Sequence, residues 1–360
     1  MRVVLTVLDA LPHRHVGPHH TPALHALAEL GAWAPDGARA VMTSATYPNH
    51  ATFVTGADPS HHGVVTNWVP ETGRVVPAWR RGPDVPTLFD ACRRAGRTSA
   101  AVVGDQHLVG VMGAAAADRH WPPAGVPPEG LELDVMGYLL DADTVAELCA
   151  VLDGAVPDLV VAQLNGPDTA AHVHGPDADA ALDAYRATDA WLPEIRARLS
   201  WRDTVWIVVS DHDQETVTAR EPVDLQRALA ERGRDLFALP EGNAAVVCGE
   251  GARAARAWLT GIDGVEGAGD LVLADRELEC CLVWAEPGHM FGFAGLPARR
   301  GTHGGPRTCT QVAVVTGGHA AVEPLARAVA SRPVAAADWA PTIATLLDLD
   351  LPTATGRSLL

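Results

Sequence analysis

The regular alternation of short apolar runs with longer amphipathic segments constrains this chain more than any other feature. Five runs are apolar and continuous enough for strands buried on both faces of a sheet, at residues 3–8, 99–103, 158–163, 204–209 and 311–315. Residues 38–42 are a candidate for a further strand. Helical spacing is found at residues 21–30, 86–95, 141–152, 177–199 and 338–347, and a further helix is expected near Pro48. This order predicts an α/β fold in which helices sandwich a largely parallel sheet.

The alternation breaks between about residues 215 and 300. A helical segment at residues 223–232 is followed there by short segments at 243–247, 252–259 and 271–274. We therefore expect a core of residues 1–214 and 301–360 and a small, cap-like α+β subdomain inserted at residues 215–300. The length of 360 residues suits one large domain or two smaller ones.

The charge balance narrows the possible partners. Acidic residues outnumber basic ones by 44 to 27, which gives a formal net charge of −17. A nucleic-acid groove needs a basic stripe, and an anionic membrane surface attracts positive charge, so we expect neither partner. An anionic substrate would need local positive charge, which bound metal ions could supply.

The N-terminal residues MRVVLTVLDA are typical of a strand and not of a signal peptide. No apolar run approaches the ~18 residues of a membrane span, so a cytoplasmic location is expected. The six cysteines form no CxxC pair and are expected to be free, mostly buried thiols.

Acidic residues and histidines follow several of the predicted strands. Asp9 ends the first strand, Asp168 and His172 follow the strand at 158–163, and Asp211 and His212 follow the strand at 204–209. In doubly wound sheets, ligands bind at the edge where the strands end, so these side chains can converge. Imidazole combined with carboxylate suits zinc better than magnesium or calcium, although manganese or iron could replace zinc.

A hydroxyl group has a favourable position in the stretch SATYPNHATFVTG. Thr46 lies just after a strand and just before the helix expected near Pro48. A phosphoryl group on Thr46 would meet the free backbone N–H groups at the start of that helix. Thr46 is therefore the preferred nucleophile.

These stretches carry a resemblance to a known family. SATYPNHATFVTGADPSHHGVVTN resembles the nucleophile region of nucleotide pyrophosphatase/phosphodiesterases, a branch of the alkaline phosphatase superfamily. PDTAAHVHGP, VVSDHD and GTHGG are similar to three further motifs of that family, in the family's order. The matching positions span residues 9 to 303, so the resemblance implies an alkaline phosphatase-like core.

The resemblance also implies roles for individual residues. One zinc ion would be held by Asp9, Thr46, Asp211 and His212, and a second by Asp168, His172 and His303. Thr46 would attack phosphorus and become phosphothreonine, while Asn67 would donate a hydrogen bond to a phosphate oxygen. The implied substrate is a small phosphorylated molecule with a phosphodiester or pyrophosphate bond.

Two departures from the family pattern leave alternatives open. Ala10 follows Asp9 where the family usually has glycine, and Gly304, Gly305 and Pro306 follow His303 where nucleotide pyrophosphatases commonly have Tyr-Asp. A phosphonate hydrolase of the phosphonoacetate type, or a phosphomonoester hydrolase, is the alternative on the same scaffold. A non-catalytic metal-binding relative is a further alternative.

Other residues near these motifs have weaker assignments. Tyr47 and Trp68 are candidates for stacking on the substrate or for the core, whereas His50, His61 and His62 are expected to be structural. The role of the histidine-rich loop at residues 13–20 and the oligomeric state stay open.

Overall fold

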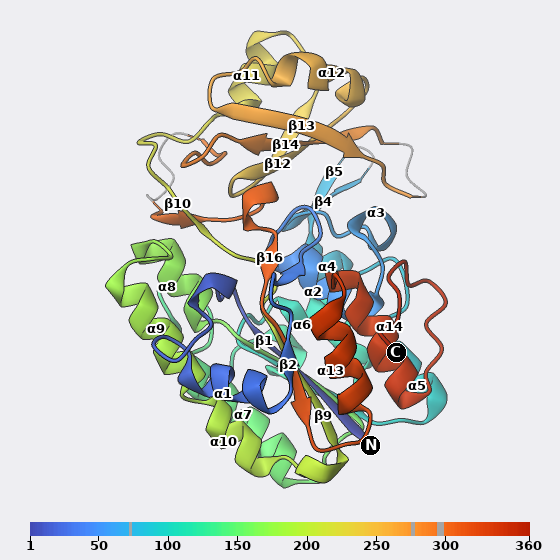
Figure 1. Ribbon diagram of the computed structural model, residues 1–360. Coiled ribbons are helices and arrows are strands. Elements are labelled where there is room, and N and C mark those ends of the chain that lie inside the picture. Colours follow the sequence, from blue (N-terminus) through green and yellow to red (C-terminus); the bar gives the residue numbers. More distant parts are fainter. Residues whose placement is uncertain (72–73, 275–277, 294–298) are drawn as a thin grey trace.

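The protein is described here by a computed structural model, which covers residues 1–71, 74–274, 278–293 and 299–360. Within these residues, a seven-stranded sheet forms the centre of the larger body (Figure 1). Its strands lie in the spatial order β2 (Ala32–Trp33), β17 (Ala313–Gly317), β9 (Thr204–Val209), β1 (Arg2–Leu8), β8 (Leu159–Leu164), β6 (Ser99–Val103) and β7 (Arg119–Trp121). Strands β9, β1, β8, β6 and β7 run parallel, whereas β17 at one edge pairs antiparallel with β9, and β2 pairs antiparallel with β17.

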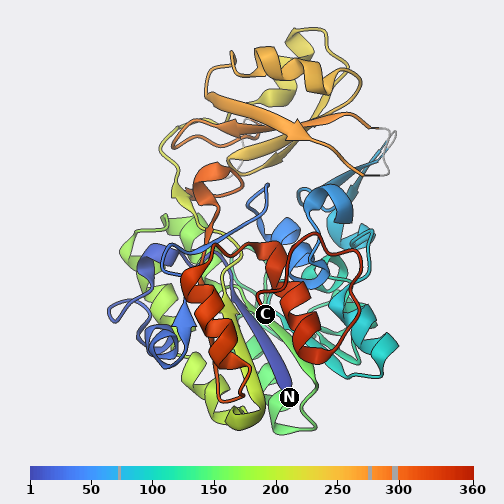
Figure 2. The same ribbon diagram turned by 45° about the vertical axis from the view of Figure 1, so that its right-hand side comes forward.

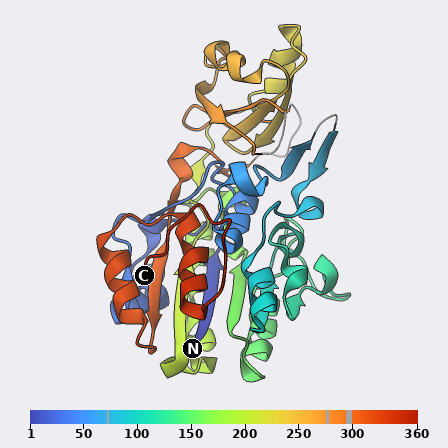
Figure 3. The ribbon, with the colours of Figure 1, turned by 90° about the vertical axis from the view of Figure 1, so that its right-hand side faces the viewer.

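Helices cover both faces of the sheet: Figure 1 shows a helical layer on either side of it, and Figure 3 looks through one of these layers onto the strands. One layer contains α2 (Thr46–Thr55), α5 (Leu88–Ala95), α13 (Val322–Ser331) and α14 (Trp339–Leu347), and the opposite layer contains α1 (Pro22–Leu30), α7 (Asp141–Asp153), α9 (Asp179–Asp189) and α10 (Leu192–Arg198). In β1, Val3, Leu5 and Val7 pack toward the first layer, and Val4 and Leu8 toward the second. Burial on both faces explains the continuous apolar run, and the predicted α/β class is confirmed.

Short elements connect the layers. The short helices are η1 (His13–His15), α3 (Pro59–His62), α4 (Ala78–Arg81), α6 (Leu108–Val111), η2 (Ala114–Ala116), η3 (Pro123–Gly125), α8 (Gly166–His174), η4 (Trp201–Asp203), η5 (Pro306–Thr308) and η6 (Ala336–Asp338). Three antiparallel pairs lie outside the larger sheets, β3 (Ala38–Arg39) with β16 (Thr310–Gln311), β4 (Trp68–Glu71) with β5 (Arg74–Pro77), and β10 (Glu215–Thr216) with β15 (Gly301–Thr302).

A second, antiparallel sheet lies beyond the carboxyl ends of the main parallel strands (Figure 2). Its spatial order is β11 (Phe237–Glu241), β12 (Ala244–Cys248), β14 (Cys280–Ala285) and β13 (Val265–Leu271). Helices α11 (Leu225–Glu231) and α12 (Ala252–Leu259) bury their apolar side chains against it. The division into a core of residues 1–214 and 301–360 and an inserted, cap-like subdomain of residues 215–300 stays a prediction, and residues 275–277 and 294–298 of that stretch lie outside the described residues.

Two sequence-based expectations about single elements are wrong. The helix expected at residues 177–199 is divided into α9 and α10. Pro193 explains the division, because it lacks an N–H group and its ring would clash with the carbonyl group of Asp189 four residues earlier. The strand expected at residues 38–42 consists only of β3, which pairs with β16 and not with the main sheet.

Two further observations concern the molecule as a whole. No helix in the described ranges is both long and apolar enough to cross a membrane. All six cysteines are buried.

Candidate active site

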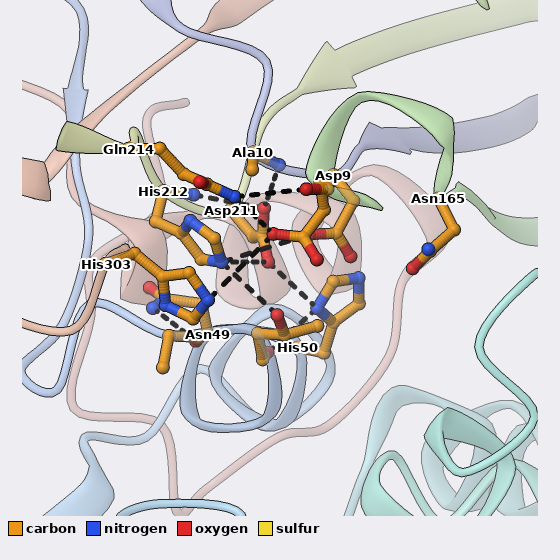
Figure 4. A network of polar contacts seen from close by, with 12 residues as sticks. Asp9, Ala10, Asn49, His50, Asn165, Asp211, His212, Gln214 and His303 are labelled. Atoms are coloured by element: carbon orange, nitrogen blue, oxygen red, sulfur yellow. Dashed lines mark hydrogen bonds and ion pairs between the residues drawn. The ribbon is translucent and has the colours of Figure 1, made fainter. Parts of the chain in front are cut away.

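The predicted acidic residues and histidines meet at the carboxyl edge of the main sheet. Strand β1 lies between β8 and β9, and all three run parallel, so they end at the same edge. Asp9 follows β1, Asp211 and His212 follow β9, and β8 leads into α8, which carries Asp168 and His172. Figure 4 shows the carboxylates of Asp9 and Asp211 and the rings of His50, His212 and His303 pointing toward one another.

The first group consists of Asp168, His172 and His303, as predicted. His172 Nε2 lies 3.1 Å from His303 Nε2 and 3.4 Å from Asp168 Oδ1, and His303 Nε2 lies 3.9 Å from Asp168 Oδ1. All three side chains are buried. His172 Nδ1 lies 2.9 Å from the carbonyl oxygen of Gly301, which favours the tautomer with its proton on Nδ1 and leaves Nε2 free to bind a metal ion.

The second group contains Asp9, Asp211, His212 and Thr46. His212 Nε2 lies 3.3 Å from Asp211 Oδ2 and 3.8 Å from Asp9 Oδ1. Thr46 Oγ1 lies 3.2 Å from the same Nε2 atom. His212 Nδ1 lies 3.0 Å from the carbonyl oxygen of Asp213, so Nε2 is again the nitrogen that faces the centre.

His50 lies closer to this centre than the sequence suggested. It forms a potential metal-binding group with Asp9 and Asp211, and its Nδ1 atom lies 3.6 Å from Asp211 Oδ2. The same Nδ1 atom lies 2.9 Å from the carbonyl oxygen of Thr46. The spacing of four residues between Thr46 and His50 places both on one face of α2, a signal that was available in the sequence.

Polar side chains hold one oxygen of each central carboxylate. Gln163 Nε2 donates to Asp9 Oδ2 at 2.7 Å, and Gln214 Nε2 donates to Asp168 Oδ1 at 2.7 Å. The backbone N–H of Ala10 donates to Asp211 Oδ1 at 2.9 Å. The remaining oxygens Asp9 Oδ1 and Asp211 Oδ2 are buried and have no hydrogen-bond partner in the described part of the chain.

The electrostatics of the centre call for a cation. Burial raises the pKa of Asp9 well above its usual value, and the carboxylates of Asp211 and Asp168 raise it further. Burial also lowers the pKa of His303 well below its usual value, with His212 and His172 adding to the effect. Neutral imidazoles and crowded carboxylates with free oxygens form a donor set that suits divalent zinc.

Thr46 is placed as a nucleophile requires. It is the first residue of α2 and is partly exposed, while the residues around it are buried. The preceding Ala45 provides no side-chain cap, so the first N–H groups of the helix are open to a ligand.

The predicted substrate-contacting residues lie in different surroundings. Asn67 is exposed. Within the described residues, its hydrogen bond to the inserted sheet comes from its backbone N–H, which donates to Glu241 Oε2 at 2.5 Å. Trp68, at the start of β4, is 46% exposed. Tyr47 is 6% exposed, and its hydroxyl group hydrogen-bonds to Asp105, which leaves little of its ring surface for stacking.

Three polar residues near the centre were not predicted from the sequence. Asp105 and Glu241 are buried, and burial raises the pKa of each to about 7. Arg299 Nη1 lies 3.3 Å from His172 Nε2. Asp105 follows strand β6 and could have been found by its place at a strand end, whereas Glu241 and Arg299 carry no comparable sequence signal.

Comparisons with known proteins indicate the family and the fold. The family model described as type I phosphodiesterase / nucleotide pyrophosphatase matches residues 3–263. No protein with a curated description matches the chain.

Three solved structures with the same overall fold illustrate the structural likeness. Human ectonucleotide pyrophosphatase/phosphodiesterase 5 has a TM-score of 0.78 at 16% identity, over 99% of this chain and 97% of that chain. An inactive threonine-to-alanine form of the murine protein, in complex with AMP, has a TM-score of 0.75 at 16% identity, over 99% and 97% of the two chains. Phosphonoacetate hydrolase from Sinorhizobium meliloti 1021, in complex with phosphonoformate, has a TM-score of 0.68 at 19% identity, over 88% and 89%.

Proposed function

This chain belongs to the type I phosphodiesterase/nucleotide pyrophosphatase family, and on that premise we propose that it is a two-zinc phosphohydrolase that cleaves phosphodiester or pyrophosphate bonds through Thr46. The single observation that carries the proposal is the position of Thr46. Its Oγ1 atom lies 3.2 Å from His212 Nε2, at the first residue of a helix and beside two groups of buried carboxylates and imidazoles.

The proposed metal ligands follow the two groups. Asp9, Thr46, Asp211 and His212 would hold one ion, and Asp168, His172 and His303 the other. Bound divalent ions would lower the pKa of the Thr46 hydroxyl group and stabilise negative charge on the phosphoryl and leaving-group oxygens. Manganese or iron could take the place of zinc with the same residues.

The residues of the chain then have defined tasks. Thr46 Oγ attacks phosphorus in line, the bond to the leaving oxygen breaks, and phosphothreonine forms. The N–H groups in the first turn of α2 face the phosphoryl oxygens and stabilise their charge. Water then attacks phosphorus from the side of the departed group and releases Thr46.

The side chains of Asn67 and Trp68 supply the proposed substrate contacts. Asn67 is exposed, and its side chain has no hydrogen bond within the described residues, so its amide can donate to a phosphoryl oxygen. Trp68 exposes an aromatic surface next to it, against which an apolar or aromatic leaving group can pack. The AMP bound to the murine relative is consistent with a nucleotide in such a position.

A phosphonate or phosphomonoester hydrolase is the second candidate. The structural likeness to phosphonoacetate hydrolase favours it, as does the Gly304-Gly305-Pro306 sequence after His303. The cytoplasmic location expected from the sequence stays a prediction.

A substrate comparison tests the proposal. The zinc-loaded protein would be assayed with bis-p-nitrophenyl phosphate, p-nitrophenyl phosphate and phosphonoacetate at equal concentrations. The proposal predicts the largest kcat/KM for the diester. A preference for the monoester or for phosphonoacetate would favour the second candidate, and two bound zinc ions without turnover would favour a binding protein.

A further inference from the structure

The hairpin turn between β11 and β12, residues 241–243, lies directly against the loop that carries His303. The backbone N–H of Asn243 donates to the carbonyl oxygen of His303 at 2.7 Å. Asn243 Oδ1 accepts a hydrogen bond of 2.5 Å from the backbone N–H of Gly305. Asn243, a buried residue of the inserted hairpin, therefore fixes the backbone at His303 through its own backbone N–H and the backbone two residues beyond through its side chain.

Asn243 is itself held from the other side. Its Nδ2 atom donates to Glu215 Oε1 at 2.6 Å, and Arg307 donates to both oxygens of Glu215, at 2.6 and 2.8 Å. Asn243 and Gly305 are buried, so the bond between them forms away from competing water, whereas Glu215 and Arg307 are partly exposed. A satisfied buried network of this kind is rigid, and removal of one member leaves its partners unpaired.

Two glycines allow the backbones of the turn and the loop to pack this closely. A Cβ atom at Gly242 would lie 2.1 Å from the carbonyl oxygen of His303, and one at Gly304 would lie 2.1 Å from the carbonyl oxygen of Glu241. Both residues also have positive φ, +62° and +118°. The close contact is therefore built into the backbone of both segments.

The same turn reaches a second part of the candidate site. Glu241 is 5% exposed, and its Oε2 atom accepts the 2.5 Å hydrogen bond from the backbone N–H of Asn67. Beyond the loop, the Ser44 N–H donates to the carbonyl oxygen of Gly304 at 2.9 Å, and Ser44 lies two residues before Thr46. The turn thus contacts the segments that carry His303 and Asn67, and through the loop it is linked to the nucleophile segment.

We propose that the 241–243 turn is a positioning element of the reaction centre, in which Asn243 sets the place of His303 and Glu241 sets the place of Asn67. The inference rests on the proposed function, because it takes His303 as a metal ligand and Asn67 as a phosphoryl contact. It assigns to the inserted region a structural task in the reaction centre.

Four variants of the full-length protein test the proposal. Asn243→Ala removes both side-chain bonds, Glu241→Ala removes the acceptor for Asn67, and Glu241→Gln keeps an acceptor while it removes the charge. Asp224→Ala is the matched control, because it removes a bond of 3.0 Å to the Arg227 N–H at the start of α11, in the same inserted region but outside the site. Zinc affinity would be measured by competition with a chelator, and kcat and KM with bis-p-nitrophenyl phosphate.

We expect Asn243→Ala to weaken the binding of one of the two zinc ions by about 10–100-fold, as loss of a supporting contact to a metal ligand commonly does. We expect Glu241→Ala to lower kcat more than it raises KM, Glu241→Gln to restore kcat, and Asp224→Ala to change neither quantity. Wild-type zinc binding by Asn243→Ala, wild-type kcat for Glu241→Ala, or an equal loss in the Asp224 control would overturn the inference.

The outcomes also separate this inference from the proposed function. If the wild-type protein hydrolyses no phosphoester, the proposed function fails, while zinc affinity in Asn243→Ala still decides the role of the turn. If Asn243→Ala does not fold, the comparison of Glu241→Ala with Glu241→Gln decides it through kcat.

Discussion

The backbone N–H of Ala10 donates to Asp211 Oδ1, and Ala10 adopts a left-handed conformation, with φ of +53°. This conformation turns the chain immediately after Asp9, and the hydrogen bond links the segments that follow β1 and β9. Glycine adopts positive φ without strain, which gives a physical reason for its usual presence at this position in the family. Ala10 keeps the turn and adds a methyl group that is fully buried.

Substitutions at Ala10 should therefore separate backbone strain from packing. For Ala10→Gly, relief of strain is offset by the lost methyl group and by the greater freedom of the unfolded chain, so we expect a change in the free energy of unfolding within about 1 kcal/mol. For Ala10→Val, a β-branched side chain at positive φ should lower the free energy of unfolding by about 3 kcal/mol and weaken zinc binding. Urea denaturation measures the free energy of unfolding, and chelator competition measures the zinc affinity. A valine variant as stable as the wild type would contradict the explanation.

His50 offers a second test, because two roles are open to it. Its Nδ1 atom lies next to the Thr46 carbonyl oxygen, and its Nε2 atom is buried without a partner in the described part of the chain. Because His212 is the proposed imidazole ligand, we expect His50 to support the start of α2. His50→Asn keeps a donor near Thr46 and should retain two zinc ions and most of the turnover, whereas His50→Ala should lose turnover about 10–100-fold. Loss of one zinc ion from the asparagine variant would instead identify His50 as a ligand.

Asp105 should make the stability of the fold depend on pH. Burial raises its pKa from 3.8 to about 7, so between these values the unfolded chain is ionised there while the folded chain keeps the proton. The free energy of unfolding should fall as pH rises through this window and be constant above it. Asp105→Asn removes this effect, and we expect its stabilisation relative to the wild type to be larger at pH 8 than at pH 4.5. Equal differences in urea midpoint at both pH values would contradict the assignment.

Much of the site was predictable because its residues follow strands. Asp9, Asp211 and His212 come directly after apolar runs, and parallel strands bring such positions to one edge. The short spacing between Asp168 and His172 places both on one turn of a helix. These relations depend on local sequence and on a largely parallel sheet, and both were accessible without coordinates, whereas the strand order was not predicted.

The residues that were missed depend on the tertiary packing of the inserted region. Glu241 and Asn243 belong to a hairpin between strands β11 and β12, and nothing in their local sequence indicates that this hairpin lies against His303. Tyr47 was a candidate for substrate stacking or for the core, and the structure places its ring in the core. The division between α9 and α10 could have been predicted from Pro193.

The central claim is that Thr46 carries the phosphoryl group during turnover. The direct measurement is rapid acid quench of the zinc-loaded protein with bis-p-nitrophenyl phosphate, followed by peptide mass spectrometry, with Thr46→Ala and Thr46→Ser in parallel. For the wild type, we predict a phosphoryl group on the peptide that contains Thr46. The alanine variant should lose this group, and its kcat should fall at least 10²-fold, whereas the serine variant should keep partial activity. The account would be contradicted if Thr46→Ala turned over the substrate at the wild-type rate, or if that variant were phosphorylated at another residue.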